Sequence, residues 1–300
     1  MALEGRAPPK IGATLAGDSR LSLLDPADRR TGVSNKCAYC DRPGTPTKDH
    51  VWPECFLERF GREVVARFSV KARRVHGADY VVNDVCPICN SGPLSLLDTA
   101  FCKLYDDFFH ELHDLESTVV FRYDFDSLAR SLLRIAFNSA RAAGSETAQL
   151  VGTRKYVIGA EPRPAQLAVF VELVAPTFLD DGSGGKKKVF PQMYRSAVTK
   201  LLTPNGGRIM TRIVAVNSFY FHLVLPREPM TLEDFEEAAG ELATLTKGVV
   251  RLLPGTSEVT LKTSPQEGLR SFLPHLTAFQ GQYAKFFEEQ KRKRKRKKGK

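Results

Sequence analysis

The chain has 300 residues, of which 42% are hydrophobic and 26% charged, and its formal net charge is +10. This composition is typical of a water-soluble chain with room for two domains of common size. It excludes a membrane-spanning protein, because no apolar run approaches the length of a span, and the start MALEGRAPPK lacks the apolar centre of a secretory signal. We therefore expect a cytoplasmic protein, nucleoid-associated if the cell is bacterial.

The first part of the chain is predicted to hold an arm and a small domain. Residues 1–35 are rich in Ala, Gly, Pro, Asp and Arg without sustained apolar periodicity, so we expect a loosely ordered N-terminal arm. Residues 36–115 mix turn residues, short apolar runs and two CxxC pairs, the pattern of a small domain that a metal holds together. Within it, apolar residues at helical spacing predict a helix over 93–113.

Residues 116–287 are predicted to form an α+β domain. A helix is expected over 125–143, with Gly144 as its stop, and another over 232–245. Strands are expected over 155–159, 166–174, 208–216 and 219–225, and the last two are separated by a tight turn that predicts a hairpin. The segment 180–188 is predicted to be an exposed flexible loop. No motif ties this domain to chemistry, so it is either scaffold or a recognition domain for a target sequence, a partner protein or a ligand.

The last ten residues contain nine Lys and Arg, so the rest of the chain carries a net charge of only about +1. Such a segment repels itself and buries nothing, which predicts a disordered polybasic tail over 288–300. Its natural partner is a polyanion, bound without sequence preference through released counterions. A solubilising or nuclear-targeting tail is the equally weighted alternative. The predicted nucleic-acid-binding residues are Lys291, Arg292, Lys293, Arg294, Lys295, Arg296, Lys297 and Lys298.

Six cysteines divide into two groups. Four of them form two CxxC knuckles, Cys37 with Cys40 and Cys86 with Cys89, and two knuckles supply the four thiolates of a tetrahedral structural zinc site. In a reducing compartment thiols stay free, which favours metal ligands over disulfides. The remaining Cys55 and Cys102 are interpreted as small buried hydrophobic residues.

Polar residues accompany the knuckles. The run Thr47-Lys48-Asp49-His50-Val51-Trp52-Pro53 lies between them, and Asn90 follows the second one directly. The order CxxC, DHVxP, CxxCN resembles the zinc-containing branch of the HNH endonucleases, whose ββα-metal unit places the Asp-His pair on a strand and the Asn at a helix. More narrowly, VCPICNSGPLSLLD resembles a set of bacterial HNH proteins with the pattern VCxxCNxGxLSxLD. The resemblance is specific over residues 37–105. It implies a small zinc-stapled ββα-metal domain before the α+β domain.

This resemblance implies a metal-dependent endonuclease acting on DNA more than on RNA. An imidazole titrates near neutral pH and can accept a proton from water, which makes His50 the candidate general base. Oxygen ligands suit Mg²⁺ or Mn²⁺, a role that we assign to Asp49 and the side-chain carbonyl of Asn90. Neighbouring strand residues point to opposite faces, so a twisted strand end or a bulge must let Asp49 and His50 flank one substrate.

Some features depart from the family pattern. Many members have a middle Asn that orients the catalytic His, and here Asn83 is the only candidate, although it lies closer to Cys86 than usual. A Lys that often follows the CxxCN run is missing. Trp52 is expected to pack in the core rather than on substrate. The alternatives to a nuclease are a zinc-dependent nucleic-acid-binding or adaptor module without chemistry, and a protein-interaction zinc fold. The oligomeric state is not predicted.

Overall fold

The computed structural model describes residues 36–60, 67–69, 74–76, 80–144, 147–180, 184–191, 194–199, 201, 203–245, 248–264, 288 and 292. The fold mixes helices and sheets, in agreement with the α+β prediction. The predicted arm, residues 1–35, lies outside the described residues. In the described part of the chain, no helix is both long and apolar enough to span a membrane.

The segment that contains the cysteines begins with two short strands and continues into a helix. Strand β1 (Thr47–His50) pairs with β4 (Val81–Val85) in antiparallel fashion, and helix α1 (Glu54–Phe60) follows β1. A second pair joins β2 (Arg67–Ser69) to β3 (Arg74–His76). After β4 the chain forms α2 (Pro87–Cys89), a π-helical turn over Asn90–Leu94 that is kinked at Gly92, and α3 (Ser95–Leu104). A second π-helical turn over Tyr105–Phe109 ends this stretch, so the predicted helix begins earlier and ends earlier than expected.

The larger sheet occupies the second half of the chain. Among the described residues seven strands form it, in the order β5 (Thr118–Arg122), β13 (Glu258–Ser264), β6 (Ala168–Val174), β11 (Phe219–Pro226), β10 (Ile209–Val216) and β9 (Tyr194–Thr199), with β12 (Val250–Leu252) also paired to β6. The predicted hairpin is confirmed as β10–β11, and Asn217 in its turn has a φ of 48°, a conformation that Asn tolerates better than most residues. The predicted strand over 166–174 is confirmed as β6.

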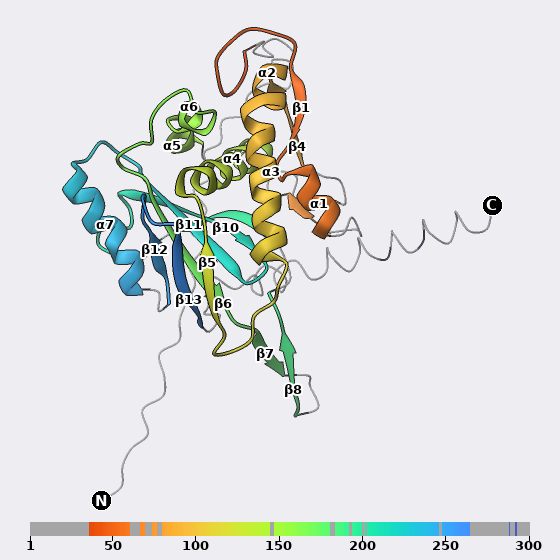
Figure 1. Cartoon of the computed structure of the whole chain (residues 1–300), viewed down its shortest axis with the longest axis vertical. Helices are drawn as coiled ribbons and strands as arrows, with labels where there is room; N and C mark the ends of the chain where they lie inside the picture. Colours follow the sequence, from red (N-terminus) through yellow and green to blue (C-terminus); the bar gives the residue numbers. More distant parts are fainter. Residues whose placement is uncertain are drawn as a thin grey trace, which may run out of the picture. The chain divides into compact units, whose positions relative to one another are not determined.

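Helices cover both faces of this sheet (Figure 1). Helix α4 (Phe125–Ala143) has its predicted bounds, with Asp124 as N-cap and Gly144 in the left-handed conformation as its stop. It packs on β9, β10 and β11 and on α3. Helix α7 (Leu232–Leu245) packs on the opposite face through Phe235, Ala238 and Leu242. Alternate residues of β6 and β10 therefore enter two separate cores, as the period of a strand requires.

Two local predictions are wrong. Residues 155–159 were expected to be a strand, but 155–157 belong to the short helix α6 (Arg154–Val157) and 158–159 to the turn after it; α6 follows α5 (Ala148–Val151) and buries Tyr156 and Val157 against α4. Packing against a neighbouring helix has overridden the strand preference of Val and Tyr. The two ends of the expected loop 180–188 instead belong to a second hairpin, β7 (Thr177–Asp180) with β8 (Lys186–Val189), whose ladder pairs the backbone groups; residues 181–183 lie outside the described residues.

One core joins the cysteine-bearing segment to the larger sheet. The described residues from Lys36 onward belong to one compact unit. Phe109, at the end of the helical stretch after the knuckles, lies with its ring centroid 5.0 Å from that of Phe219 and 5.5 Å from that of Phe221. Trp52 is buried, as predicted, with its ring centroid 5.0 Å from that of Tyr194 on β9. The boundary near residue 115 stays a prediction, and the described residues on its two sides share a hydrophobic core.

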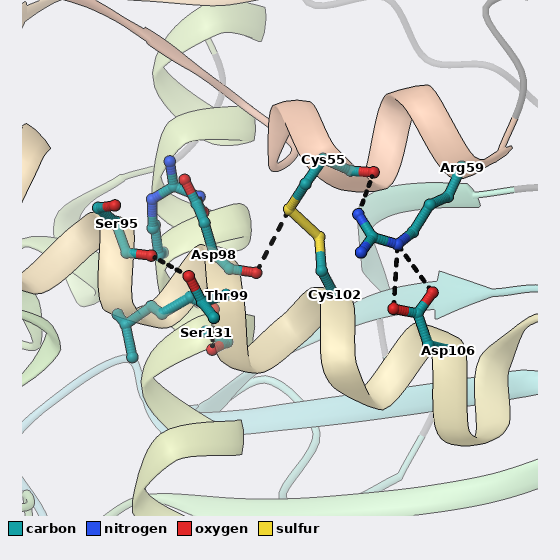
Figure 2. The surroundings of a disulfide bond; sticks show 10 residues. Cys55, Arg59, Ser95, Asp98, Thr99, Cys102, Asp106 and Ser131 are labelled. Carbon is teal, nitrogen blue, oxygen red and sulfur yellow. Dashed lines mark hydrogen bonds and ion pairs between the residues drawn. A yellow bond between two sulfur atoms is a disulfide. The ribbon is translucent and has the colours of Figure 1, made fainter.

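A disulfide fastens α1 to α3, which corrects the interpretation of its cysteines as unbonded hydrophobic residues. Figure 2 shows Cys55 of α1 bonded to Cys102 of α3, with Arg59 paired to Asp106 beside them. The two Cα atoms are 6.3 Å apart, within the range that a disulfide spans. The sequence offered no sign of this pairing, because the two cysteines are 47 residues apart and meet only when the two helices pack.

Reduction of this disulfide is expected to destabilise the protein. Its sequence separation is 47 residues, and closing such a loop lowers the free energy of folding by about 2 to 4 kcal/mol. Urea unfolding with and without a phosphine reductant measures the difference, with zinc content followed in parallel. The double variant Cys55→Ser/Cys102→Ser is the control, and its stability should not respond to the reductant. An unchanged free energy of unfolding for the reduced wild-type protein would contradict the prediction.

Candidate functional site

Four cysteines gather in one place, as the two knuckles predicted. The sulfur atoms of Cys37, Cys40, Cys86 and Cys89 all lie within 4.8 Å of one another. The Sγ atoms of Cys40 and Cys86 are 3.7 Å apart, close to the roughly 3.8 Å edge of a tetrahedron with Zn–S bonds of about 2.3 Å. The first knuckle precedes β1, and the second begins at the end of β4 and enters α2. The four thiols could hold a zinc ion.

Hydrogen bonds and burial make the cluster suited to a cation. Burial raises the pKa of the Cys37 thiol, but N–H groups of the backbone at Cys86, Cys40 and Tyr39 outweigh burial and lower this pKa to about 7. Burial and the neighbouring sulfur atoms of Cys40 and Cys86 raise the pKa of Cys89. Thiolates crowded in a buried space repel one another, and a divalent metal ion relieves this repulsion.

His50 lies at the end of β1 and is half-buried. The pairing register of β1 with β4 shifts between Thr47 and Asp49, but Asp49 and His50 themselves pair regularly with Val82 and Val81, so this irregularity does not bring their two side chains to one side. The side chains of β1 alternate, with Lys48 exposed, Asp49 buried and His50 partly exposed. Within the described residues the Nδ1 atom of His50 is buried without a hydrogen-bond partner. Buried polar atoms normally have a partner, so this nitrogen is suited to bind water or a ligand.

Asn90 links the second knuckle to β1. Its Nδ2 donates to Oγ1 of Thr47 at 2.9 Å and to the carbonyl oxygen of Lys48 at 3.0 Å. The amide therefore fixes the start of the strand that ends at His50. Its other end, the Oδ1 oxygen, makes no hydrogen bond to the described part of the chain, so it is available for the predicted ligand role.

Asp49 points into the core, towards α4. Its side chain is 2% exposed, its Oδ1 lies 2.5 Å from Nη2 of Arg134, and its Oδ2 accepts a hydrogen bond of 2.6 Å from Nδ2 of Asn138. A hydrated Mg²⁺ or Mn²⁺ ion needs open oxygen ligands. This carboxylate does not fit that requirement, because both its oxygen atoms are bound to α4. The arrangement therefore does not favour the predicted role of Asp49 as a ligand of a catalytic metal.

Asn83 is exposed on β4, and the described residues show no hydrogen bond between it and His50. A different amide, Asn138 of α4, donates to the carbonyl oxygen of His50 at 3.3 Å. Its Oδ1 accepts hydrogen bonds from the hydroxyl of Tyr39 at 2.7 Å and from Arg141 at 2.6 Å. Sequence reasoning missed Asn138. The available signal was a pair of polar residues, Arg134 and Asn138, four positions apart among the buried residues of a helix.

Arg134 binds a second carboxylate, Asp98 of α3, as well as Asp49. Arg134 is 1% exposed. Burial raises the pKa of Asp98 to about 6, although the Arg134 guanidinium lowers it in part. A carboxyl whose pKa is higher in the folded than in the unfolded protein binds its proton more tightly when folded. Its contribution to stability is therefore present below about pH 4 and lost as the pH rises towards 6.

Asp98→Asn is expected to remove this pH dependence. The difference in free energy of unfolding between the variant and the wild type should move in favour of the variant by about 2 kcal/mol between pH 4 and pH 6. Urea unfolding of both proteins at pH 4, 5, 6 and 7 measures the difference. A difference that is the same at all four pH values would contradict the prediction. Asn at this position keeps an oxygen that accepts a hydrogen bond from Arg134, so folding should be preserved.

The predicted tail residues lie largely outside the described part of the chain. Of the eight predicted nucleic-acid-binding residues, Arg292 belongs to the described set, where it is exposed and in a helical conformation. The proposed contact of the tail with nucleic acid stays a prediction.

The geometry brings the four cysteines together and joins Asn90 to the start of β1, the strand that ends at His50, while Asp49 faces away from solvent and Asn83 makes no hydrogen bond to His50 in the described structure. Comparison of the chain with family models, curated proteins and solved structures finds no match.

Proposed function

We propose that the chain hydrolyses phosphodiester bonds in nucleic acid, DNA more than RNA, as an HNH-type nuclease with His50 as its general base. The observation that carries the proposal is the placement of His50. It ends a strand that is held between two cysteine knuckles, it is partly open to solvent, and its buried Nδ1 has no partner among the described residues. The buried His222 of β11 also lacks hydrogen-bond partners at both ring nitrogens among the described residues, so it is the position of His50 at the partly open end of β1 that sets it apart.

The order of elements supports the proposal. Strand β1 carries His50, β4 pairs with it, and α2 begins at the second knuckle with Asn90 at its end. Hydrolysis needs a water molecule that loses a proton as it attacks phosphorus, and an imidazole on a fixed strand can take that proton. Lys48, two residues earlier and on the same side of the strand as His50, is exposed and suited to contact a phosphate. A divalent metal ion, when bound, would stabilise negative charge on the phosphate, and Asn90 is the predicted ligand whose oxygen is open.

A second candidate is a zinc-dependent nucleic-acid-binding module without hydrolytic activity. The engagement of both Asp49 oxygen atoms by Arg134 and Asn138 favours it, because that carboxylate would otherwise be the natural metal ligand. The basic tail suits either candidate, since phosphate contacts give affinity without chemistry.

Incubation of the purified full chain with supercoiled plasmid and with single-stranded RNA separates the two candidates. Each substrate is tested with Mg²⁺, with Mn²⁺ and with a chelator at a concentration that leaves the zinc content unchanged. The proposal expects cleavage that requires a divalent ion and His50. His110→Ala is a matched control, because His110 lies at the end of a helix outside the site. Retention on DNA without any cleavage would reject the nuclease and select the binding module.

A further inference from the structure

The inward side of β1 is fastened to α4 by a buried polar cluster. Asp49, Arg134 and Asn138 are 3%, 1% and 0% exposed, and their contacts join residues 85 and 89 positions apart in the chain. A buried carboxylate that has a guanidinium on one oxygen and an amide on the other is fully paired. Removing Arg134 would leave the Asp49 carboxylate buried without its counter-charge, which is strongly unfavourable. This carboxylate is therefore fixed in its place.

We propose that Asp49 is a positioning residue for His50 and that Arg134 and Asn138 are the groups that hold it. The inference rests on the proposed function, since the group being positioned is the proposed general base. It gives Asp49 a role other than that of a metal ligand. It also makes α4, which lies outside the cysteine-bearing segment, part of the site.

The geometry explains how Asp49, whose side chain points into the core, fixes the direction in which the side chain of His50 points. Adjacent residues of a strand face opposite sides, so fixing Asp49 against α4 turns His50 towards the other side of β1. Asn138 contacts both residues, because its Nδ2 donates to Oδ2 of Asp49 and to the carbonyl oxygen of His50. The strand is thus held at two successive residues by one amide. A base that moves by about 1 Å can lose a factor of about 100 in rate, so this anchoring has a measurable consequence.

The chain offers matched variants for a test. Asp49→Asn and Arg134→Gln each remove the charge of one partner, and the double variant removes both charges of this pair. Asp98→Asn is the control, because Asp98 binds the same guanidinium from α3 and has no contact with β1 in the described structure. Three measurements are made on the full chain: the affinity for MnCl₂ by electron paramagnetic resonance, the contacts of the His50 ring by NMR nuclear Overhauser effects, and the turnover number and KM on plasmid.

If Asp49 positions His50, Asp49→Asn and Arg134→Gln both change the contacts of the His50 ring and both lower the turnover number by about 10- to 100-fold, with KM and Mn²⁺ affinity close to those of the wild type. Asp98→Asn keeps the wild-type turnover number at pH 7. If instead Asp49 is a metal ligand, Asp49→Asn weakens Mn²⁺ binding at least about 10-fold. Arg134→Gln then strengthens Mn²⁺ binding, because it frees the carboxylate. This opposite response of the two variants would overturn the inference.

The test remains decisive if a variant is unstable or the enzyme assay fails. Should Arg134→Gln not fold, the double variant Asp49→Asn/Arg134→Gln is expected to melt at a higher temperature than Arg134→Gln, because it leaves no unpaired buried charge at β1. A wild-type protein that cleaves nothing would reject the proposed function. The Mn²⁺ and NMR measurements would still show whether Asp49 holds His50 in place, and a His50 ring that keeps its wild-type contacts in both single variants would reject the inference by itself.

Discussion

Replacement of Cys86 by Ser is expected to release the zinc ion and to unfold the segment around the knuckles. Structural zinc sites contribute apparent binding free energies of about 10 to 16 kcal/mol, which matches or exceeds the net stability of a typical domain, about 5 to 15 kcal/mol. Cys86 is buried, its Sγ lies 3.7 Å from that of Cys40, and its backbone N–H donates to the Sγ of Cys37. Without the Cys86 thiol, three cysteine ligands remain, and three thiols cannot complete a four-coordinate zinc site.

The loss of stability in Cys86→Ser should extend beyond the knuckles to the larger sheet. Cys37, Cys86 and Cys89 belong to the same buried cluster as the sheet residues Val171 and Phe221. Zinc content by atomic absorption and the thermal unfolding transition measure the result. The double variant Cys55→Ser/Cys102→Ser is the matched control, since it also removes cysteines but should keep one zinc ion per chain. A Cys86→Ser protein that retained a full equivalent of zinc and the wild-type melting temperature would show that the four thiols are not a metal site.

His50→Ala is expected to abolish most cleavage while leaving the fold intact. General-base catalysis contributes about 10²- to 10⁴-fold in rate, so the turnover number should fall by that factor. The side chain is partly exposed at the end of a strand, and its Nδ1 has no hydrogen-bond partner in the described residues, so its truncation leaves no buried group unpaired. Zinc content and melting temperature should stay at the wild-type values.

The contrast with Cys86→Ser distinguishes a catalytic from a structural role. One variant should lose activity alone, and the other should lose zinc, fold and activity together. Plasmid cleavage, zinc content and thermal unfolding are measured side by side for the two variants and for His110→Ala. Wild-type cleavage by the His50→Ala protein would remove His50 from the reaction and, with it, the basis of the proposed function.

Local patterns in the sequence were sufficient to predict the elements whose structure depends on residues that are close together in the chain. The bounds of α4, including its stop at Gly144, follow from apolar spacing and from the ease with which glycine adopts a positive φ. The β10–β11 hairpin follows from two strand-forming runs around Asn217 and Ser218. The cluster of four cysteines follows from two CxxC knuckles, because four soft ligands in that spacing have one common use.

Tertiary packing decided the features that depend on distant partners. Residues 155–157 are helical because α6 packs on α4, and Cys55 meets Cys102 because α1 packs on α3. The direction in which Asp49 points was decided by Arg134 and Asn138, which lie more than 80 positions further along the chain. The sequence by itself determined which residues are available for chemistry, since residue type and spacing are local. Only the folded structure determined which of them remain open to a ligand, because a buried charge must be paired and its partner is chosen by the packing of the whole core.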